Sequence, residues 1–441
     1  MSEYHTFAEA LEHVEETERP KEPGPSKLEP AIVIPTFWTK ESRANAHEHS
    51  EVKPYEHPTD IADPNPGLGY LLASLSGKPR VGKIILVVRA TDRVLMSRAE
   101  NRVRDIVDNF PELDVFVLGE VETGSLLRRM DELDLGAMVS SIDLDSYGAA
   151  RNLGLIAASI FGKDSVIFID DDEVVEDEHF IEAGLFGLGL PIQKGGYLYA
   201  KSGYYINEDG SWQHANDDKS IAGVVWRQAD AYNKALSYVM QPPRLQRARI
   251  VFGGCLAVHK EMYTQIAFDP WVMRGEDVDY LINIRLHGGE MYIDDKWNVV
   301  HMSGGIASPA ARFRQNIYRF IYEHRKLEFA KSQVDLSRVT SSSLDPWPGD
   351  FVDSSVELRA RITGLLHAIF GPERAQYWHA GTKTVRSASE YARQHCADYF
   401  ALQRAWSFMM NKLWEDVPLG SLYSGERKID RTAYTGEFRA V

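Results

Sequence analysis

Short apolar runs alternate with amphipathic stretches over the first part of the chain. Continuous apolar runs are typical of buried strands, and apolar residues at helical spacing are typical of helices. The runs that predict strands are Ala31–Thr36, Lys83–Arg89, Asp114–Leu118 and Ser165–Ile169. The patterns that predict helices are Gly67–Ser76, Arg98–Asn109 and Gly148–Phe161. Strands that alternate with helices indicate an α/β fold with a largely parallel sheet.

Two polar segments interrupt this pattern. The first follows the opening strand, which we expect to end at Pro35, and carries prolines at 54, 58, 64 and 66. A segment of this length is expected to be an ordered loop over a functional site. The second, Gly195–Val251, is less periodic and rich in polar residues. We interpret it as an insertion or as a region that faces an acceptor.

The two ends of the chain have a different composition. Residues 1–29 are rich in Glu, Pro and Lys, which predicts a flexible arm with one short helix around Phe7–Thr17. Two helical blocks, Arg312–Lys331 and Val356–Trp414, are joined by the linker Ser337–Asp350. The chain is thus divided into an arm (1–29), an α/β domain (30–305) and a helical region (306–441). The tail from about Pro418 is expected to be loose, and the apolar face of the C-terminal helices is a candidate homo-oligomer contact.

Charge and cysteine content exclude several classes of protein. The 441 residues carry a net charge of −15, which disfavours general binding to nucleic acid or to anionic lipid. The two cysteines, Cys255 and Cys396, make no disulfide framework and fit a reducing compartment. There is no apolar run long enough to span a bilayer, and the polar N-terminus is unlike a signal peptide. These features predict a cytoplasmic protein without an integral membrane segment.

The strongest chemical signal is an apolar run that ends in Asp170, Asp171 and Asp172. Open α/β sheets bind their ligands at the carboxyl ends of strands. Asp170 and Asp172 lie on one face of an extended chain, so both can point at one cation. Hard divalent ions take such oxygen ligands, which predicts a Mn²⁺ or Mg²⁺ site that carries phosphates. The alternatives are a solvated acidic turn and the Walker B strand of an ATPase, but the G-x-x-x-x-G-K-[ST] loop that accompanies Walker B is absent.

Further motifs occur in a fixed order around this triplet. They are Ile34-Pro35-Thr36, Gly148-Ala-Ala-Arg151-Asn152-Leu-Gly154, Arg274-Gly275-Glu276-Asp277-Val-Asp279 and His301. In this order and spacing they resemble the GT-A glycosyltransferases, most closely the family-2-like group. The resemblance covers Ala31 to Gly305 and implies a Rossmann-like, mostly parallel nucleotide-diphospho-sugar transferase domain. The two polar segments depart from the compact pattern of that family.

The resemblance implies a role for each matching residue. Asp170 would contact the ribose or the metal, and Asp172 and His301 would bind the metal. Asp277 would be the catalytic base, with Glu276 beside it. The residues assigned to the nucleotide sugar are Pro35, Thr36, Arg89, Arg151, Asn152, Asp170, Asp171, Gly253 and Gly254, with the two glycines at the end of a strand Ile250–Phe252.

Each of these residues also has a structural interpretation. Arg151 would then form only an ion pair with Asp170, and Asp277 and Asp279 would cap a helix Tyr280–Leu286. For Asp279, support of the structure or capping is the expected role. His301 would simply end the strand Trp297–His301.

The predicted function is metal-dependent transfer of a hexose from a UDP- or GDP-sugar to a hydroxyl acceptor. An inverting reaction with Asp277 as base is expected, and a retaining reaction with the same metal site is the alternative. A sugar nucleotidyltransferase would show a Gly-rich basic loop after the first strand, whereas Phe37–Arg43 is not Gly-rich. A non-catalytic sugar-nucleotide-binding protein is the remaining hypothesis, against which the intact carboxylates argue.

Overall fold

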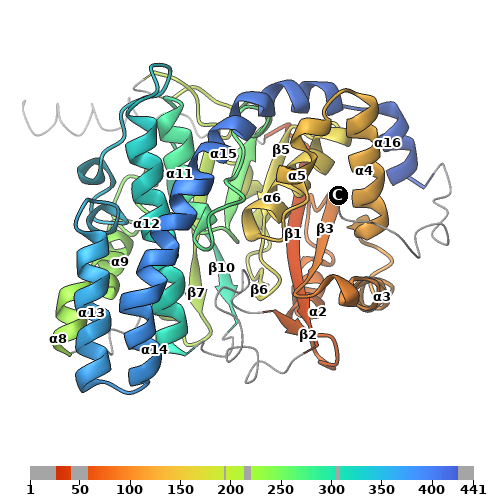
Figure 1. Cartoon of the computed structure of the whole chain (residues 1–441). Helices are drawn as coiled ribbons and strands as arrows, with labels where there is room; N and C mark the ends of the chain where they lie inside the picture. The colour runs from red at the N-terminus through yellow and green to blue at the C-terminus, as the bar shows by residue number, and fades with distance from the viewer. Residues whose placement is uncertain (1–25, 41–57, 193–194, 213–219, 303–307, 426–441) are drawn as a thin grey trace, which may run out of the picture.

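The protein is represented by a computed structural model that describes residues 26–40, 58–192, 195–212, 220–302 and 308–425. Within these ranges, one ten-stranded sheet runs in the order β4-β3-β1-β5-β9-β7-β10-β6, with β2 (Thr59–Asp60) on β1 and β8 (Leu245–Arg247) on β10 (Figure 1). Most of the arm, with its predicted helix, and residues 41–57 of the predicted loop lie outside the described residues. The α/β fold with C-terminal helices is confirmed.

The parallel half of the sheet matches the predicted strands. It consists of β4 (Val115–Leu118), β3 (Lys83–Ala90), β1 (Pro30–Thr39) and β5 (Ser165–Phe168). Helices α2 (Gly67–Leu75), α3 (Met96–Val107) and α6 (Tyr147–Ile160) form at the three predicted helical patterns. Every residue of β1 and β5 is buried, as expected for strands covered on both faces.

The two longest helices, α12 and α15, lie in the C-terminal region. The α-helices are α2 (Gly67–Leu75), α3 (Met96–Val107), α4 (Glu120–Glu132), α5 (Val139–Ile142), α6 (Tyr147–Ile160), α7 (Phe180–Leu185), α8 (Ile221–Trp226), α9 (Gln228–Ser237), α10 (Lys260–Tyr263), α11 (Glu276–Leu286), α12 (Pro309–Ala330), α13 (Val356–Phe370), α14 (Arg374–His379), α15 (Val385–Leu413) and α16 (Val417–Tyr423). Single turns of tighter or wider helix lie at Arg93–Leu95, Gly136–Met138, Ser341–Leu344, Gly349–Phe351 and Ala380–Thr384.

The first strand does not end at Pro35, as predicted, but continues to Thr39. Ile169 donates its backbone N–H to Val33 O (3.1 Å), so the backbone polar groups of Val33 face β5. Pro35 lies two residues later and therefore faces the same side. The pairing of β1 with β5 stops at Val33. The missing N–H of Pro35 therefore breaks no ladder hydrogen bond, and the strand continues along β3.

The other half of the sheet is mixed. Strand β9 (Leu256–His259) runs antiparallel to both β5 and β7 (Ala200–Asn207). Strand β10 (Tyr292–His301) is parallel to β7, and β6 (Glu173–Val174) is antiparallel to β10. Because β7 lies inside the sheet, the region from residue 195 is in part integral to the fold rather than an insertion.

A buried ion pair stabilises this part of the sheet. Lys201 Nζ of β7 lies 2.7 Å from Asp294 Oδ2, and both side chains are fully buried. Arg244 Nε donates to the other oxygen of Asp294 at 2.8 Å. Burial lowers the pKa of Lys201 to about 8, against the opposing attraction of Asp294. These paired charges occupy positions at which a buried strand ordinarily carries apolar residues.

The C-terminal helices pack against the sheet domain. Helices α11 to α14 lie beside the β7–β10 side of the sheet, and α15 runs from α12 across to α6 (Figure 1). Arg129 Nη2 of α4 lies 3.0 Å from Asp416 Oδ2, at the start of α16. The tail predicted to be loose from Pro418 therefore forms a docked helix as far as Tyr423. The predicted linker packs onto the protein, with Leu344 and Trp347 buried.

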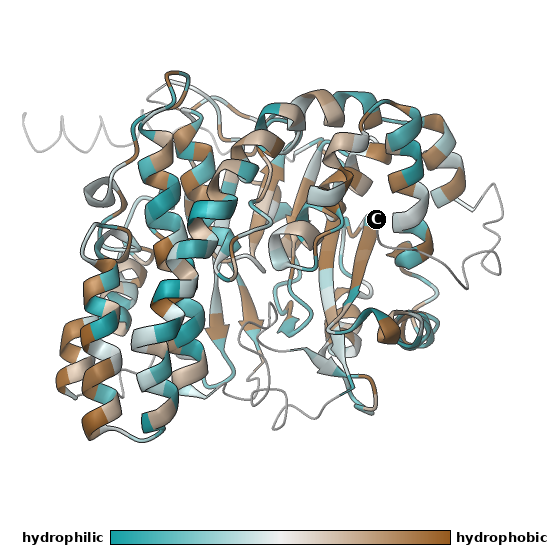
Figure 2. Cartoon of the chain, in the orientation of Figure 1, coloured by the Kyte–Doolittle hydropathy of each residue, from teal (hydrophilic) through white to brown (hydrophobic). Residues whose placement is uncertain are grey.

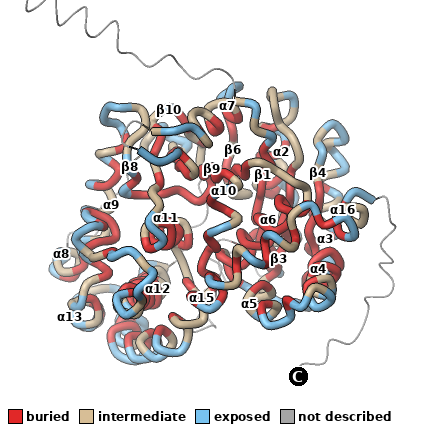
Figure 3. Tube along the Cα trace, turned by 90° about the horizontal axis from the view of Figure 1, so that it is seen from above, coloured by how far each residue is buried: buried red, intermediate tan, exposed pale blue. Residues whose placement is uncertain are grey.

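Hydrophobic residues are concentrated along the strands, whereas the helices carry hydrophobic and hydrophilic residues together (Figure 2). Seen from above, buried residues occupy the centre of the molecule and exposed residues its periphery (Figure 3). In the described ranges, no helix combines the length and the apolar character needed to cross a bilayer.

Candidate functional site

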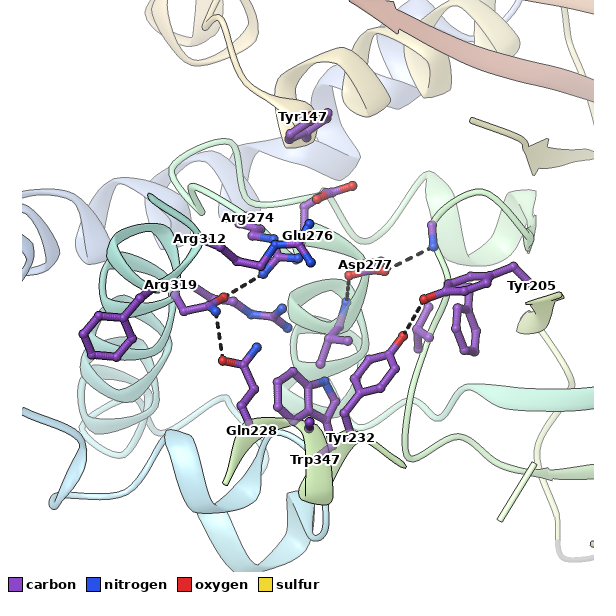
Figure 4. A pocket seen from close by; sticks show the side chains of 18 of the residues that line it. Tyr147, Tyr205, Gln228, Tyr232, Arg274, Glu276, Asp277, Arg312, Arg319 and Trp347 are labelled. Atoms are coloured by element: carbon purple, nitrogen blue, oxygen red, sulfur yellow. Dashed lines mark hydrogen bonds between the residues drawn. The ribbon is translucent and has the colours of Figure 1, made fainter. Parts of the chain in front are cut away.

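A cavity of about 940 Å³ opens at the carboxyl ends of β1 and β5. Its walls come from the acidic run after β5, residues 251–254, the start of α11, and one face of α12 (Figure 4). Helices α8, α9, α13 and α14 also contribute residues to the lining. The cavity therefore spans the sheet edge and the C-terminal helices, where open α/β sheets bind ligands.

The three aspartates after β5 point to different partners. Arg151 Nη2 donates to Asp170 Oδ1 at 2.9 Å, and Thr36 Oγ1 donates to Asp171 Oδ2 at 2.6 Å. Asp172 Oδ1 lies 3.8 Å from His301 Nδ1. All three aspartates line the cavity, as does Pro35. Thr36 is fully buried and does not line the cavity, so it orients Asp171 from behind the cavity wall.

The pair of Asp172 and His301 is fixed by the backbone around it. Met302 donates its backbone N–H to Asp172 O at 2.8 Å, and the antiparallel pairing of β10 with β6 sets His301 opposite Glu173. Within the described residues, no cluster of three or more His, Cys, Asp or Glu side chains could hold a metal ion. The predicted set of Asp170, Asp172 and His301 is therefore not gathered into one cluster, because Asp170 is bound to Arg151.

Two protein donors still fit a divalent cation that is shared with a phosphorylated ligand. Mg²⁺ is commonly bound through one or two carboxylates together with substrate phosphates, and imidazole nitrogen is also a good ligand for Mn²⁺. Asp172 and His301 supply one carboxylate and one imidazole that face each other on the cavity wall. The donor chemistry of this pair therefore fits the metal, with the remaining positions left to the ligand and water.

Arg151 connects the three parts of the cavity wall. Besides Asp170, its Nε donates to Glu276 Oε1 at 2.9 Å, and its Nη1 donates to Gly253 O at 3.1 Å. Burial alone would lower the pKa of Arg151, but Asp170 and Glu276 outweigh burial and raise it. Burial raises the pKa of Glu276, and Arg151 opposes that shift. With all three nitrogens engaged, Arg151 supports the wall, which is the structural role considered for it.

Glu173 also lines this wall, although no role was predicted for it. Its Oε2 accepts the backbone N–H of Asp170 at 3.1 Å, and its side chain is almost fully buried. Burial raises the pKa of Glu173 well above its usual value, and the charges of Asp170 and Asp172 raise it further. Glu173 therefore closes the turn that presents the aspartates. In the sequence, Glu173 directly follows the three aspartates, and this position indicates that it belongs to the same site.

Gly253 and Gly254 lie in a turn, not at the end of a strand as predicted, because Ile250–Phe252 is not part of the sheet and β9 begins only at Leu256. A Cβ atom on Gly253 would lie 2.4 Å from Arg151 Nη2. On Gly254 it would lie 2.2 Å from both carboxylate oxygens of Glu173. Only glycine therefore allows this close approach to the two charged groups.

We expect Gly254→Ala to destabilise the protein by about 1–3 kcal/mol, because overpacking must displace the buried Glu173. The turn that carries the aspartates should be disturbed with it. Urea denaturation measures the effect. Gly69→Ala in α2 is the matched control, since its Cβ would meet no atom within 4 Å, and it should be neutral or slightly stabilising. Equal stability of the two variants would contradict this description of the loop.

The start of α11 places Asp277 on the cavity wall. Gly275 precedes the helix with a φ of +70°, a conformation that favours glycine. Asp277 Oδ2 accepts the backbone N–H of Gly253 at 3.2 Å, and its Oδ1 accepts that of Val278 at 2.7 Å. The helix begins at Glu276, not at Tyr280 as predicted. The aspartates of this segment thus lie in the first turn, where negative charge is favourable, rather than at a cap.

Three predicted site residues, Thr36, Arg89 and Asn152, do not line the cavity, and neither does Asp279, for which a structural role was predicted. Asn152 uses both ends of its amide on Phe268: Nδ2 donates to its O and Oδ1 accepts its N–H, each at 2.9 Å. Arg89 is buried on β3, outside the cavity lining. Asp279 is fully buried and accepts from Lys326 Nζ at 2.8 Å, in a structural role. For Asn152 and Arg89, a direct contact with a ligand in this cavity does not fit the position found.

A polar face of α12 also lines the cavity, and no role in the site was predicted for its residues Asn316 and Arg319. Arg312, Asn316 and Arg319 lie at helical spacing and all line the cavity. The signal was present as polar residues at positions i, i+4 and i+7. The aromatic residues of the same helix indicated a packing face instead. Tyr205 and Tyr232, whose hydroxyl oxygens lie 3.3 Å apart, were also missed.

No protein family model matches the chain, and no curated protein matches it. Solved structures give loose matches. A mannosyltransferase from Pyrobaculum calidifontis in complex with GDP-Man and Mn²⁺ is 12% identical, with a TM-score of 0.40, over 96% of this chain and 95% of that chain. GalNAc-T7 with UDP, GalNAc and Mn²⁺ is 12% identical, with a TM-score of 0.35, over 79% and 59%. Glucosyl-3-phosphoglycerate synthase from Mycobacterium tuberculosis with Mn²⁺ and UDP-glucose is 13% identical, with a TM-score of 0.31, over 66% and 75%. Because these TM-scores are low, the functional assignment depends on the side chains of the cavity.

Proposed function

We propose that this protein is a metal-dependent glycosyltransferase that moves a hexose from a nucleotide-diphosphate sugar to a hydroxyl acceptor. One observation carries the proposal: a single cavity at the sheet edge contains both the facing pair of Asp172 and His301 and the carboxylate of Asp277. Sugar transfer needs both a site for the diphosphate and a group that takes the proton of the acceptor.

In this proposal the donor lies along the acidic run. Asp172 and His301 would hold Mn²⁺ or Mg²⁺, and the bound ion would offset the negative charge that develops on the leaving diphosphate. Pro35 and the Asp171 carboxylate, oriented by Thr36, line the part of the cavity beside β1. A UDP- or GDP-sugar is the expected donor.

Asp277 would act as the base in an inverting reaction. The acceptor oxygen attacks C1 of the hexose, the bond from C1 to the diphosphate oxygen breaks, and the acceptor proton passes to the Asp277 carboxylate. The backbone N–H groups of Gly253 and Val278 orient this carboxylate. Arg151 and Glu276 bond to each other in the surrounding wall.

The test is a thermal-shift panel of UDP-, GDP-, ADP-, CDP- and dTDP-sugars, each with and without Mn²⁺. A ligand that binds the native state raises the melting temperature by mass action. We expect a Mn²⁺-dependent shift for one nucleotide, lost in Asp172→Ala and kept in Glu178→Ala. Glu178 is exposed and does not line the cavity, so it controls for loss of a carboxylate. The absence of any shift with Mn²⁺ present would contradict the proposed function.

A further inference from the structure

Three arginines gather on one side of the cavity. Arg312 and Arg319 come from α12, and Arg274 comes from the residues just before α11. Figure 4 shows their guanidinium groups on the same side of Glu276 and Asp277. The carboxylates of the acidic run after β5 line another part of the same cavity. Basic side chains that line a concave wall attract anions.

Arg319 has an unused hydrogen-bond donor. Its Nε donates to Glu323 Oε1 at 2.9 Å, and its guanidinium packs on Gly275, where a Cβ would lie 2.1 Å from Nη1. Its Nη2 is buried and has no hydrogen-bond partner in the described part of the chain. Only 5% of the Arg319 surface is exposed. A buried donor left unsatisfied destabilises a fold, so an unmatched donor in a cavity wall indicates a ligand.

Arg274 is held in place before any ligand arrives. Its Nη1 donates to Asn316 Oδ1 at 2.7 Å, and Asn316 Nδ2 donates to Gln228 Oε1 at 2.8 Å. Trp226 Nε1 donates to the same Gln228 oxygen at 2.8 Å. This chain of hydrogen bonds orients Arg274 from α9 and α12 together. Pre-oriented donors lose less conformational entropy when they bind an anion.

The arginines lie on the far side of Asp277 from the pair of Asp172 and His301. Asp277 accepts the backbone N–H of Gly253. Gly254, which follows Gly253 in the chain, packs on Glu173, and Glu173 lies opposite His301 in the sheet. In the other direction, Gly275 at the start of α11 packs on Arg319. In Figure 4, Asp277 accordingly lies between Tyr205, whose ring packs on His301, and the arginines. The arginine side is thus the acceptor side of the proposed reaction.

We propose that Arg319 and Arg274 bind an oxyanion of the acceptor, so that the acceptor is a hydroxyl compound that carries a carboxylate or a phosphate. This inference rests on the proposed function, because it assigns the acceptor class of the same cavity. The planar guanidinium fork matches carboxylate and phosphate oxygens in pairs. A neutral acceptor would leave the buried N–H of Arg319 unmatched. The competing source of an anion is the diphosphate of the donor itself.

The experiment fills the donor site first. The protein is saturated with Mn²⁺ and the nucleoside diphosphate identified in the thermal-shift panel, and calorimetry then measures the binding of inorganic phosphate. Glycerol 3-phosphate, glycerate and glycerol are titrated in parallel, since they share a carbon skeleton and differ in the anion. We expect phosphate and at least one of the two anionic compounds to bind, and glycerol not to bind. Comparison of glycerol 3-phosphate with glycerate distinguishes a phosphate from a carboxylate acceptor.

Variants then identify the binding residues. Arg319→Lys keeps a charge beside Glu323 but removes the fork, and should weaken anion binding at least tenfold; this order of loss follows from the strength of charge-assisted pairs. Arg274→Lys, at a less buried position, should do the same. Arg314→Lys on α12, which does not line the cavity, should bind as the wild type does.

The inference fails if the loaded protein binds none of the anions, or if Arg319→Lys and Arg274→Lys both bind them as tightly as the wild type. Normal binding of the nucleoside diphosphate in that case leaves the proposed function intact. If no nucleoside diphosphate binds the wild type in the presence of Mn²⁺, the proposed function itself fails, and the assignment of an acceptor class fails with it.

Discussion

Replacement of Asp277 by Asn is expected to lower the rate of sugar transfer by about 10²–10⁴-fold, the usual contribution of a general base. The amide has nearly the same shape as the carboxylate and keeps an oxygen to accept the N–H of Gly253. It cannot take the acceptor proton at neutral pH. Because Asp277 is not part of the pair of Asp172 and His301, the Mn²⁺-dependent thermal shift by the donor should be unchanged.

The measurement is product formation under saturating donor, with the thermal shift recorded on the same preparation. Substantial turnover by Asp277→Asn with normal donor binding would contradict the inverting reaction and favour the retaining alternative. Loss of both transfer and donor binding would show that Asp277 is needed to build the cavity, contrary to the role given to it here.

Lys326→Met is expected to destabilise the protein by about 3–5 kcal/mol, the range found when one partner of a buried ion pair is removed. Lys326 Nζ lies 2.7 Å from Asp269 Oδ2 and 2.8 Å from Asp279 Oδ2, and all three side chains are fully buried. The variant leaves two buried carboxylates without a cation. These contacts join α12 to α11 and to the segment that carries Asp269, so the loss should affect the whole protein.

The effect should depend on pH. Burial raises the pKa of Asp279 to about 6, although Lys326 opposes the shift. A carboxyl with a raised pKa binds more protons in the native state than in the unfolded state. Its contribution to stability is therefore complete at acidic pH and is lost as pH rises through the native pKa. Without Lys326 the native pKa rises further, so Lys326→Met should lose less stability at pH 5 than at pH 8.

Urea denaturation at both pH values measures these differences. Lys331→Met is the matched control on the end of the same helix, because Lys331 forms only an exposed pair with Glu328. Exposed pairs contribute at most about 1 kcal/mol. Similar losses in the two variants, or a larger loss for Lys326→Met at pH 5 than at pH 8, would contradict the assigned role of Lys326.

The sequence predicted the parallel half of the sheet because its strands are apolar throughout. Strand β7 was not predicted, since it carries Lys201 and Ser202, which are buried only because partners lie far away in the chain. Lys201 pairs with Asp294 across 93 positions. A pattern read along a short window contains no information on such a partner, so a buried charged strand is taken for a polar loop.

The candidate site was predicted in its chemistry and less well in its contacts. Carboxylates after a buried strand are distinctive, and Asp170, Asp172 and Asp277 do line one cavity. The pair of Arg151 and Asp170 was one of two interpretations of the sequence. The bonds of Arg151 to Glu276 and Gly253 were not predictable, because they form only through the packing of α6 against distant parts of the chain. The same holds for Arg319, whose environment is formed by the loop before α11.

The central claim is that the facing pair of Asp172 and His301 holds a metal ion beside a nucleotide sugar. The direct measurement is a crystal structure with Mn²⁺ and the donor selected by the thermal-shift panel, in which Mn²⁺ is located by its anomalous scattering. We predict one anomalous peak in contact with Asp172 and His301, with the diphosphate beside it in the cavity. A nucleotide bound outside this cavity, or a Mn²⁺ peak away from both side chains, would contradict the account.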